Sequence, residues 1–148
     1  GWFCAGGGPE WNAINDPLAT AIVYGNGFQS RPPLHYSCGL DVTTQCILHR
    51  DVCRGKFADY PVLGPVRDFA EVWFAAREQV TFHDPLAAVC VFEPDICTWR
   101  DTRIRVPVQP PTDGYTVPEY RPAETPHKIA EAVDTERFFD RYFGVLGR

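Results

Sequence analysis

The sequence predicts an α/β fold, in which helices flank a sheet and a small group of strands comes late in the chain. Two helices begin with the same tetrapeptide, Asp-Pro-Leu-Ala, at 16–19 and 84–87. Asp is a favoured N-cap and Pro a favoured first helical residue. Residues 102–108 alternate apolar and polar side chains, which is typical of a half-buried strand. Short apolar segments alternate with helix-like segments before that point, and this alternation indicates the α/β class.

The first part of the chain is expected to hold two helices between short strands. The expected elements, in order, are an apolar strand ending in a glycine turn at 1–8, a polar loop at 10–15, a helix from Asp16 to Gly25 or Gly27, a buried strand at 34–40, and a helix capped by Thr43 or Thr44 that runs to His49. Residues 50–65 contain turn formers and few periodic signals, so no regular element is predicted there.

The second part is expected to contain three helices and a late strand group. The expected elements are a helix at 66–78, a helix from His83 to about Phe92, a strand at 102–108, an edge strand at 115–117, a strand at 128–133 and a closing helix capped by Asp134. Phe69 and Trp73 share one face of the helix at 66–78. Their spacing favours packing in the core, and stacking on a nucleobase is the alternative.

Charge and hydropathy restrict the class of partner. The formal net charge is -5 and the sequence pI is about 5.3, with Lys and Arg scattered along the chain. A nucleic-acid backbone requires a concentrated basic face, so no nucleic-acid partner is expected. No apolar run approaches the roughly 20 residues of a membrane-spanning helix, so no membrane partner is expected either. A small neutral ligand is compatible with this composition.

The six cysteines favour buried thiols over disulfides. No two of them form a Cys-x-x-Cys pair, so neither a zinc site nor a thioredoxin-type site is indicated. An even number is compatible with a disulfide set. The chain nevertheless has enough apolar residues for a core, and it has no Asn-x-Ser/Thr site. Buried thiols favour a reducing compartment such as the cytoplasm.

The start of the chain predicts a partner. It reads Gly1-Trp2-Phe3-Cys4, and the sequence contains no methionine. Aromatic residues in this position are expected where a chain begins inside a buried strand, as in a fragment, a processed product or one piece of a split protein. A strand at 1–4 would be an exposed sheet edge unless another chain covered it. We therefore expect a tightly bound partner along that edge.

His83 and Asp84 form the candidate site whose side chains are best suited to catalysis or metal binding. They place a titratable imidazole beside a carboxylate at a helix N-terminus, which is electropositive. Asp16 provides an internal comparison, because it begins a helix in the same way after an asparagine. Helix capping explains both aspartates equally, so spacing alone leaves the catalytic, metal-binding and structural interpretations open.

Three segments, taken in order, resemble a known family. Residues 82–88, Phe-His-Asp-Pro-Leu-Ala-Ala, resemble the H-D-P segment of the inosine-uridine-type nucleoside hydrolases. Residues 9–17 resemble that family's E-F-N segment, with Trp11 in place of Phe, and residues 40–43 resemble its L-D-V-T segment. Residues 133–139 are similar to its closing helix. The resemblance covers nearly all of residues 1–148 and implies one half-domain, the C-terminal portion of a mainly parallel sheet with flanking helices.

The resemblance implies roles for four residues. It implies that Asp84 coordinates a calcium ion, that His83 is the acid for the leaving base, and that Glu10 and Asn12 bind ribose hydroxyls. The implied reaction is hydrolysis of the N-ribosidic bond of a ribonucleoside by a water that calcium orients.

Two departures from the family restrict this implication. The family's aspartate-rich segment, which supplies most calcium ligands and the base, has no counterpart, because the sequence contains no Asp-Asp or Asp-x-Asp pair. One carboxylate is far short of the roughly 6 to 8 oxygens that calcium takes. The loop before Glu10 is also short and lacks the family's sugar-binding asparagine. We therefore expect the chain alone neither to bind calcium tightly nor to hydrolyse nucleosides, and expect an N-terminal half or companion chain to carry the aspartate cluster.

Other functions remain open. The missing aspartate segment favours a non-catalytic structural or interaction subunit that reuses the fold, whereas the intact His83, Asp84, Glu10 and Asn12 favour part of an enzyme. A small secreted cysteine-rich binder is a third interpretation. Three histidines have no partner visible in the sequence and receive no role: His35, His49 and His127.

Overall fold

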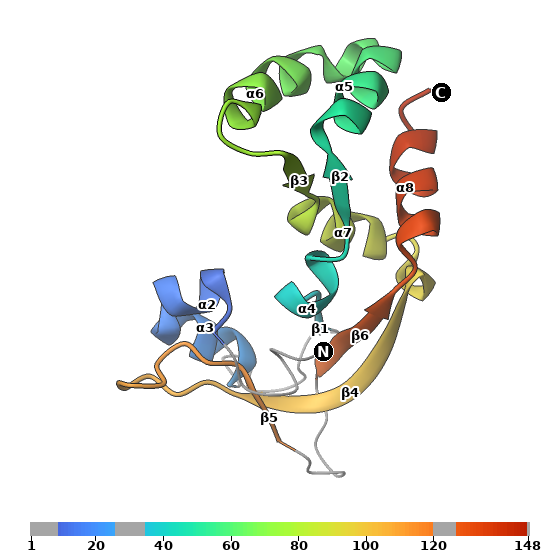
Figure 1. The fold of residues 1–148 in the computed structure, drawn as a ribbon. Helices are drawn as coiled ribbons and strands as arrows, with labels where there is room; N and C mark the ends of the chain where they lie inside the picture. Colours follow the sequence, from blue (N-terminus) through green and yellow to red (C-terminus); the bar gives the residue numbers. More distant parts are fainter. Residues whose placement is uncertain (1–8, 26–34, 120–126, 148) are drawn as a thin grey trace. The chain divides into compact units, whose positions relative to one another are not determined.

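The α/β class is confirmed in the computed structural model, which describes residues 9–25, 35–119 and 127–147 (Figure 1). The chain forms two compact units. Unit 1 comprises Gly1–Val42 and Cys97–Val133, and unit 2 comprises Thr43–Ile96 and Asp134–Arg148. The expected strand at 1–4, with the partner along its edge, lies outside the described residues. None of the described helices is long and apolar enough to cross a membrane.

Unit 1 contains a four-stranded sheet with two short helices. Its elements are α2 (Trp11–Asn15), α3 (Pro17–Tyr24), β1 (His35–Ser37), most of α4 (Leu40–Thr43), β4 (Cys97–Arg105), β5 (Val117–Glu119) and β6 (His127–Val133). The strand order is β1-β6-β4-β5. Within the described residues, β1–β6 is parallel, whereas β4–β6 and β4–β5 are antiparallel, which differs from the mainly parallel sheet that the resemblance implied. No helix lies between β4 and β5 in the described residues, and strands joined directly by a loop pair antiparallel.

The helix predicted from Asp16 begins as expected. The Asp16 carboxylate accepts a hydrogen bond from the Ala19 amide at 2.8 Å, and Pro17 is the first residue of α3. Its last residue, Tyr24, packs against the buried pair Ile104 and Ile129 of the sheet. Ile104 of β4 and Ile129 of β6 therefore lie at the centre of a core cluster in unit 1.

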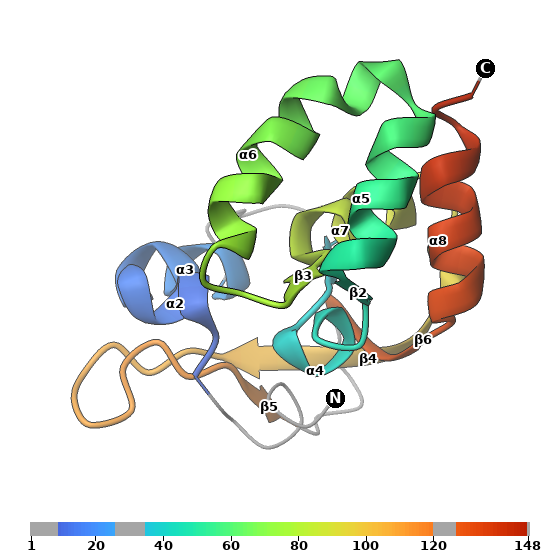
Figure 2. The same ribbon diagram turned by 45° about the horizontal axis from the view of Figure 1, so that its top comes forward.

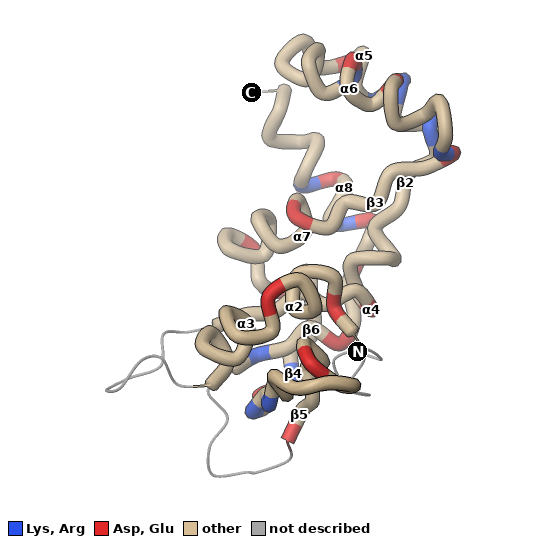
Figure 3. Tube along the Cα trace, turned by 90° about the vertical axis from the view of Figure 1, so that its left-hand side faces the viewer, with Lys and Arg blue, Asp and Glu red and all other residues tan. Residues whose placement is uncertain are grey.

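Ion pairs involve three arginines of β4. Blue and red residues lie close together around β4 and β5 in Figure 3. Arg100 pairs with Glu131 of β6, and Glu119 of β5 lies 3.7 Å from Arg103 and 3.2 Å from Arg105. Surface ion pairs contribute only about 0 to 1 kcal/mol each, and these pairs are partly exposed. They compensate the charge of the β4 arginines.

Unit 2 is built mainly from helices around a two-stranded sheet. Its elements are β2 (Ile47–His49), α5 (Arg50–Asp59), η1 (Pro61–Leu63), α6 (Gly64–Phe74), β3 (Gln79–Thr81), α7 (His83–Cys90), η2 (Pro94–Ile96) and α8 (Thr135–Gly144). Figure 2 shows α5 beside α6 and α7 beside α8, and both pairs are in contact. Strands β2 and β3 are antiparallel.

Two sequence predictions in unit 2 are wrong. The expected helix through His49 is instead α4 followed by strand β2, because residues 47–49 pair with residues 79–81 of β3. Helix α5 forms where no element was predicted. It buries only Cys53 and Phe57, four residues apart, and its other positions are mostly charged, so its apolar period is faint in the sequence.

The closing helix provides the core of unit 2. Asp134 accepts a hydrogen bond from the Arg137 amide at 3.0 Å, as its predicted capping role requires. Phe82 is 3% exposed and lies edge-on to aromatic rings of α8, with centroid distances of 5.2 to 6.4 Å. The rings of this cluster belong to Phe138, Phe139, Tyr142 and Phe143. The residue before the H-D-P segment is thus fixed by the core.

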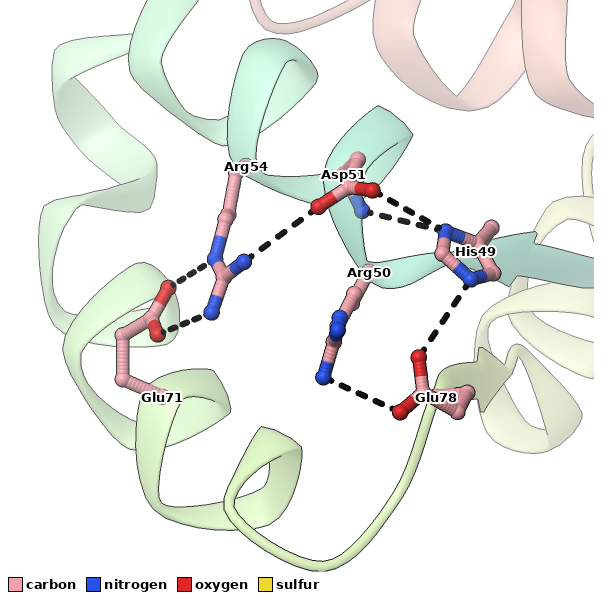
Figure 4. Close-up of polar contacts among 6 residues, drawn as sticks. All are labelled: His49, Arg50, Asp51, Arg54, Glu71 and Glu78. Atoms are coloured by element: carbon pink, nitrogen blue, oxygen red, sulfur yellow. Dashed lines mark hydrogen bonds and ion pairs between the residues drawn. The ribbon is translucent and has the colours of Figure 1, made fainter.

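An exposed ion-pair network links α5 to its neighbours (Figure 4). Nε and Nη2 of Arg54 donate to the two carboxylate oxygens of Glu71 in α6, each at 2.8 Å, and these hydrogen bonds hold the pKa of Glu71 below its usual range. The His49 ring lies 3.6 Å from Asp51 and 3.5 Å from Glu78. His49 therefore has a structural role that the sequence did not show.

The described cysteines are thiols in the interior. They form no disulfide with one another, and four of the five are buried: Cys46, Cys53, Cys90 and Cys97. Burial raises the pKa of Cys46 and of Cys53 to about 11, with a smaller contribution from Cys90 at Cys46. These two thiols are therefore protonated and unreactive at neutral pH.

Candidate functional site

His83 is the first residue of α7, and a buried hydroxyl orients its ring. Its Nδ1 lies 2.8 Å from Oγ1 of Thr43, which is only 3% exposed. The His83 side chain itself is exposed. With Nδ1 engaged, Nε2 is the nitrogen left to exchange a proton with a ligand. Because Thr43 ends the L-D-V-T segment, two of the three sequence motifs meet here.

The two Asp-Pro-Leu-Ala segments differ in the structure. Asp16 caps α3, but Asp84 lies inside the first turn of α7, whose N-cap is Phe82. No hydrogen bond or ion pair joins Asp84 to another residue in the described ranges, and its side chain is exposed. The prediction that both aspartates cap their helices is therefore wrong for Asp84, because α7 already begins at His83, the residue before it. Its carboxylate is available to a ligand.

Asp84 does not by itself form a calcium site. Calcium takes about 6 to 8 oxygen ligands. Among residues 9–25, 35–119 and 127–147, no three carboxylate or imidazole side chains converge as a metal site requires. The described residues therefore do not complete a calcium site, and any such site that includes Asp84 needs further ligands.

His83 lines a cavity of about 420 Å³ in unit 2 together with aromatic side chains of α6. Phe69 is 77% exposed and Trp73 is 52% exposed, so the prediction that they pack in the core is wrong. Helix α6 buries Phe74 instead, and its apolar residues extend over more than one face. The indole Nε1 of Trp73 donates to the Gln79 carbonyl at 2.8 Å, which fixes the ring beside the cavity.

Glu10 and Asn12 both line a second cavity, of about 450 Å³, in unit 1. Oε1 of Glu10 accepts a hydrogen bond from the Leu40 amide at 2.9 Å, which connects the E-W-N segment to the L-D-V-T segment. Asn12 is exposed on α2. The structure thus brings the predicted sugar-binding pair together in unit 1, while His83 and Asp84 belong to unit 2.

The comparison with known proteins agrees with these motifs. Residues 7–140 match the family model described as inosine-uridine preferring nucleoside hydrolase. The chain belongs to this family of nucleoside hydrolases. No curated protein sequence matches it closely enough to count as a relative.

Two solved nucleoside hydrolases share the fold. One is the purine-preferring ribonucleoside hydrolase from Gardnerella vaginalis, with a TM-score of 0.75, 24% identity and 91% of this chain covered. The other is a plant nucleoside hydrolase, with a TM-score of 0.69, 18% identity and 91% coverage. This chain spans 45% and 46% of their lengths, so it corresponds to about half of each structure.

The chain also contains a histidine pair that the sequence did not reveal. His35 and His127 are register partners on β1 and β6, and their Nδ1 atoms lie 2.9 Å apart. Nε2 of His127 lies 3.0 Å from the Tyr24 carbonyl. Burial lowers the pKa of both imidazoles, with a further contribution from His127 at His35 and from Arg103 at His127. Only the strand register, which the sequence does not specify, could have predicted this pair.

Acidification is expected to destabilise unit 1 through this pair. Unfolded imidazoles bind a proton near pH 6.5, whereas burial holds the folded pKa of His35 and His127 lower. Below about pH 6.5 the unfolded state therefore binds more protons, and the free energy of unfolding falls by at most about 1.4 kcal/mol per pH unit for each group. Urea unfolding at several pH values checks this, with the double variant His35→Phe, His127→Phe as the comparison. Equal slopes for both proteins in this acidic range would contradict it.

Proposed function

We propose that this chain supplies one side of the active site of a calcium-dependent N-glycosidase that hydrolyses the N-ribosidic bond of ribonucleosides. An N-terminal half or companion chain carries the aspartate cluster. The observation that carries the proposal is the geometry of the H-D-P segment in a chain of the nucleoside hydrolase family. The Thr43 hydroxyl orients the His83 ring, and the neighbouring Asp84 does not cap its helix. Its thiols suit a reducing compartment such as the cytoplasm.

His83 is the proposed acid for the leaving base. When the N-ribosidic bond breaks, the base departs with the electron pair, and a proton delivered to the base makes it a better leaving group. In the imidazolium form, Nδ1–H of His83 donates a hydrogen bond to the Thr43 hydroxyl, so Nε2 carries the proton that is transferred. The exposed position of His83 gives a ligand access to that atom.

The cavity that His83 lines suits a nucleobase. Phe69 and Trp73 offer two exposed aromatic surfaces there, and a planar base gains from packing against such rings. Placing the base in this cavity also places it beside the proposed proton donor. The sugar is proposed to bind Glu10 and Asn12, because a carboxylate and an amide are suitable partners for hydroxyl groups.

Asp84 is proposed to contribute one carboxylate to the calcium site. Its side chain is exposed and has no described partner, so it does not have to leave another interaction to bind the ion. The remaining ligands are assigned to the aspartate cluster of the missing half, because the described residues do not gather them.

Removal of the Trp73 ring is expected to weaken nucleoside binding in the completed enzyme. Trp73→Ala should raise KM for a purine nucleoside by about 3- to 10-fold and change kcat little, because aromatic stacking contributes about 0.5 to 1.5 kcal/mol. Val72→Ala is the matched control, since Val72 lies on the same helix, is 78% exposed and does not line the cavity. Steady-state kinetics of both variants distinguish the two positions; equal KM values would argue against a base in this cavity.

The alternative is a non-catalytic subunit, and exposed apolar side chains favour an interaction surface in either case. Along α2 and α3, the exposed fraction is 69% for Trp11, 63% for Leu18 and 55% for Ile22. Patches of this kind mark protein contacts.

Assays of the isolated chain with inosine and uridine are expected to show no turnover. Turnover by the chain alone would show that no second half is needed.

A further inference from the structure

Cys38 and Cys97 bring two thiols together in unit 1, and the proposed reaction gives them no role. Their Sγ atoms lie within 4.8 Å of each other. Cys38 directly follows β1, and Cys97 is the first residue of β4. No Cys-x-x-Cys spacing marks this pair in the sequence, because the sheet brings together two segments that are distant in the chain.

A disulfide does not suit this pair. Strands β1 and β4 lie on opposite sides of β6 in the order β1-β6-β4-β5. Two strand spacings amount to about 9.5 Å. The Cα atoms of a disulfide are usually only about 4.4 to 6.8 Å apart, so a direct sulfur–sulfur bond would require movement of the backbone. Both cysteines are free thiols in the structure, in agreement with this argument.

The separation suits an ion held between the two sulfur atoms. Metal–thiolate bonds are about 2.3 Å long, so two such bonds in a straight line join sulfur atoms about 4.6 Å apart. Thiolates are soft ligands that select soft ions such as Cu(I). Cu(I) has a filled d shell and binds two thiolates in a nearly linear arrangement, whereas zinc takes a tetrahedron of ligands. Two thiols therefore complete a site for Cu(I) but not for zinc.

The cavity of unit 1 provides a route to the pair. Cys38 is half-buried and lines that cavity, whereas Cys97 is 4% exposed and does not line it. One ligand is thus accessible to an entering ion, and the other lies in the interior, which limits access of solvent to the bound ion. Calcium prefers oxygen ligands, so it does not compete for the two sulfur atoms.

We propose that Cys38 and Cys97 form a binding site for a soft monovalent cation, Cu(I), which crosslinks β1 to β4 across β6. Each thiol loses its proton to solvent and forms one metal–sulfur bond, and no electron is transferred. The inference does not rest on the proposed function, because neither thiol has a part in the proposed hydrolysis. Loss of hydrolytic activity and loss of copper binding are therefore separate outcomes.

Chemical labelling tests the site in the unmodified 148-residue chain. In the absence of oxygen, iodoacetamide should modify Cys38 before it modifies the four buried cysteines, Cys46, Cys53, Cys90 and Cys97. One equivalent of Cu(I) should abolish the labelling of Cys38, which peptide mass spectrometry measures. Labelling of Cys38 that Cu(I) leaves unchanged would overturn the proposal. No variant is needed, so the result does not depend on folding of a mutant.

Competition with a chromophoric Cu(I) chelator measures the affinity. The chain should bind one Cu(I), with two sulfur neighbours in its X-ray absorption spectrum. Cys38→Ser and Cys97→Ser should each weaken binding by more than about 100-fold, because loss of an outer-shell partner alone costs about 10- to 100-fold. Cys53→Ser is the matched control, since Cys53 is a buried cysteine of unit 2 whose thiol donates to the Leu48 carbonyl. Undiminished binding by Cys38→Ser, or nitrogen and oxygen neighbours in the spectrum, would refute the assignment.

Proton release distinguishes a dithiol site from unspecific binding of the ion. Two protons leave when Cu(I) binds two thiols, so the apparent affinity should rise by about 100-fold per pH unit between about pH 6 and 7, below the ordinary thiol pKa. Zinc should bind more weakly than Cu(I), and calcium should not bind. An affinity that does not change with pH, or equal affinities for zinc and Cu(I), would contradict a two-thiol site.

Discussion

Replacement of Phe138 with alanine is expected to lower the free energy of unfolding of unit 2 by about 3 to 5 kcal/mol. Phe138 is fully buried, and its ring lies 4.9 Å from that of Phe139, 6.0 Å from that of Tyr142 and 6.3 Å from that of Phe82. Truncation removes these contacts and leaves a cavity that the surrounding rings can fill only in part. Because native domains have only about 5 to 15 kcal/mol of stability, unit 2 should be largely unfolded on mild heating.

Phe92→Ala is the matched control for this prediction. Phe92 belongs to the same unit and carries the same side chain, but it is 78% exposed. Its truncation should change the free energy of unfolding by less than about 0.5 kcal/mol. Urea unfolding followed by circular dichroism measures both variants. A Phe138→Ala protein within about 1 kcal/mol of the original chain would show that the aromatic cluster is not the core of unit 2.

His83→Ala is expected to lower kcat of the completed enzyme for a natural nucleoside by about 10² to 10⁴-fold. The reason is the loss of the proton that assists departure of the base. A riboside whose leaving group departs readily as an anion, such as nitrophenolate, needs no such proton. Its hydrolysis should therefore fall far less. Parallel assays of the two substrates separate acid catalysis from a general disturbance of the site.

Thr43→Val distinguishes the orienting role from the acid itself. This variant keeps His83 and its proton but removes the hydroxyl 2.8 Å from Nδ1. We expect a smaller loss, about 10- to 100-fold in kcat, with a changed pH profile because the partner of the imidazole has changed. If His83→Ala slows both substrates equally, His83 does not act as the acid, and its contact with Thr43 is structural.

Local signals predicted the elements that begin with a cap. Asp16 and Asp134 satisfy backbone amides within three residues, so the chemistry that starts each helix is visible in the sequence. The alternation of apolar and polar side chains in β4 was also visible in the local sequence, although the strand begins earlier than predicted, at Cys97. The formation of strand β2 and the exposure of Phe69 could not be predicted from the local sequence, because both depend on segments distant in the chain. Residues 47–49 are a strand because residues 79–81 pair with them, and no local period encodes that.

The candidate site was predictable by motif and not by geometry. Glu10 and Asn12, which the family resemblance named as sugar-binding residues, line one cavity, and the H-D-P segment begins α7. The sequence could not show that Asp84 leaves its helix uncapped, because the identical tetrapeptide at 16–19 does cap. Nor could it show that His35 meets His127, since 92 residues separate them and only the β1–β6 register joins them.

The central claim is that this chain holds one side of a nucleoside hydrolase site and is completed by another half. The most direct test is to isolate the protein from cells that produce it, identify by mass spectrometry what accompanies residues 1–148, and assay the same preparation with inosine and uridine. We predict a bound segment or companion chain with an aspartate cluster, release of free base by the assembly, and no turnover after the two parts are separated. Turnover by the chain alone, or an intact assembly inactive toward both nucleosides, would contradict the account.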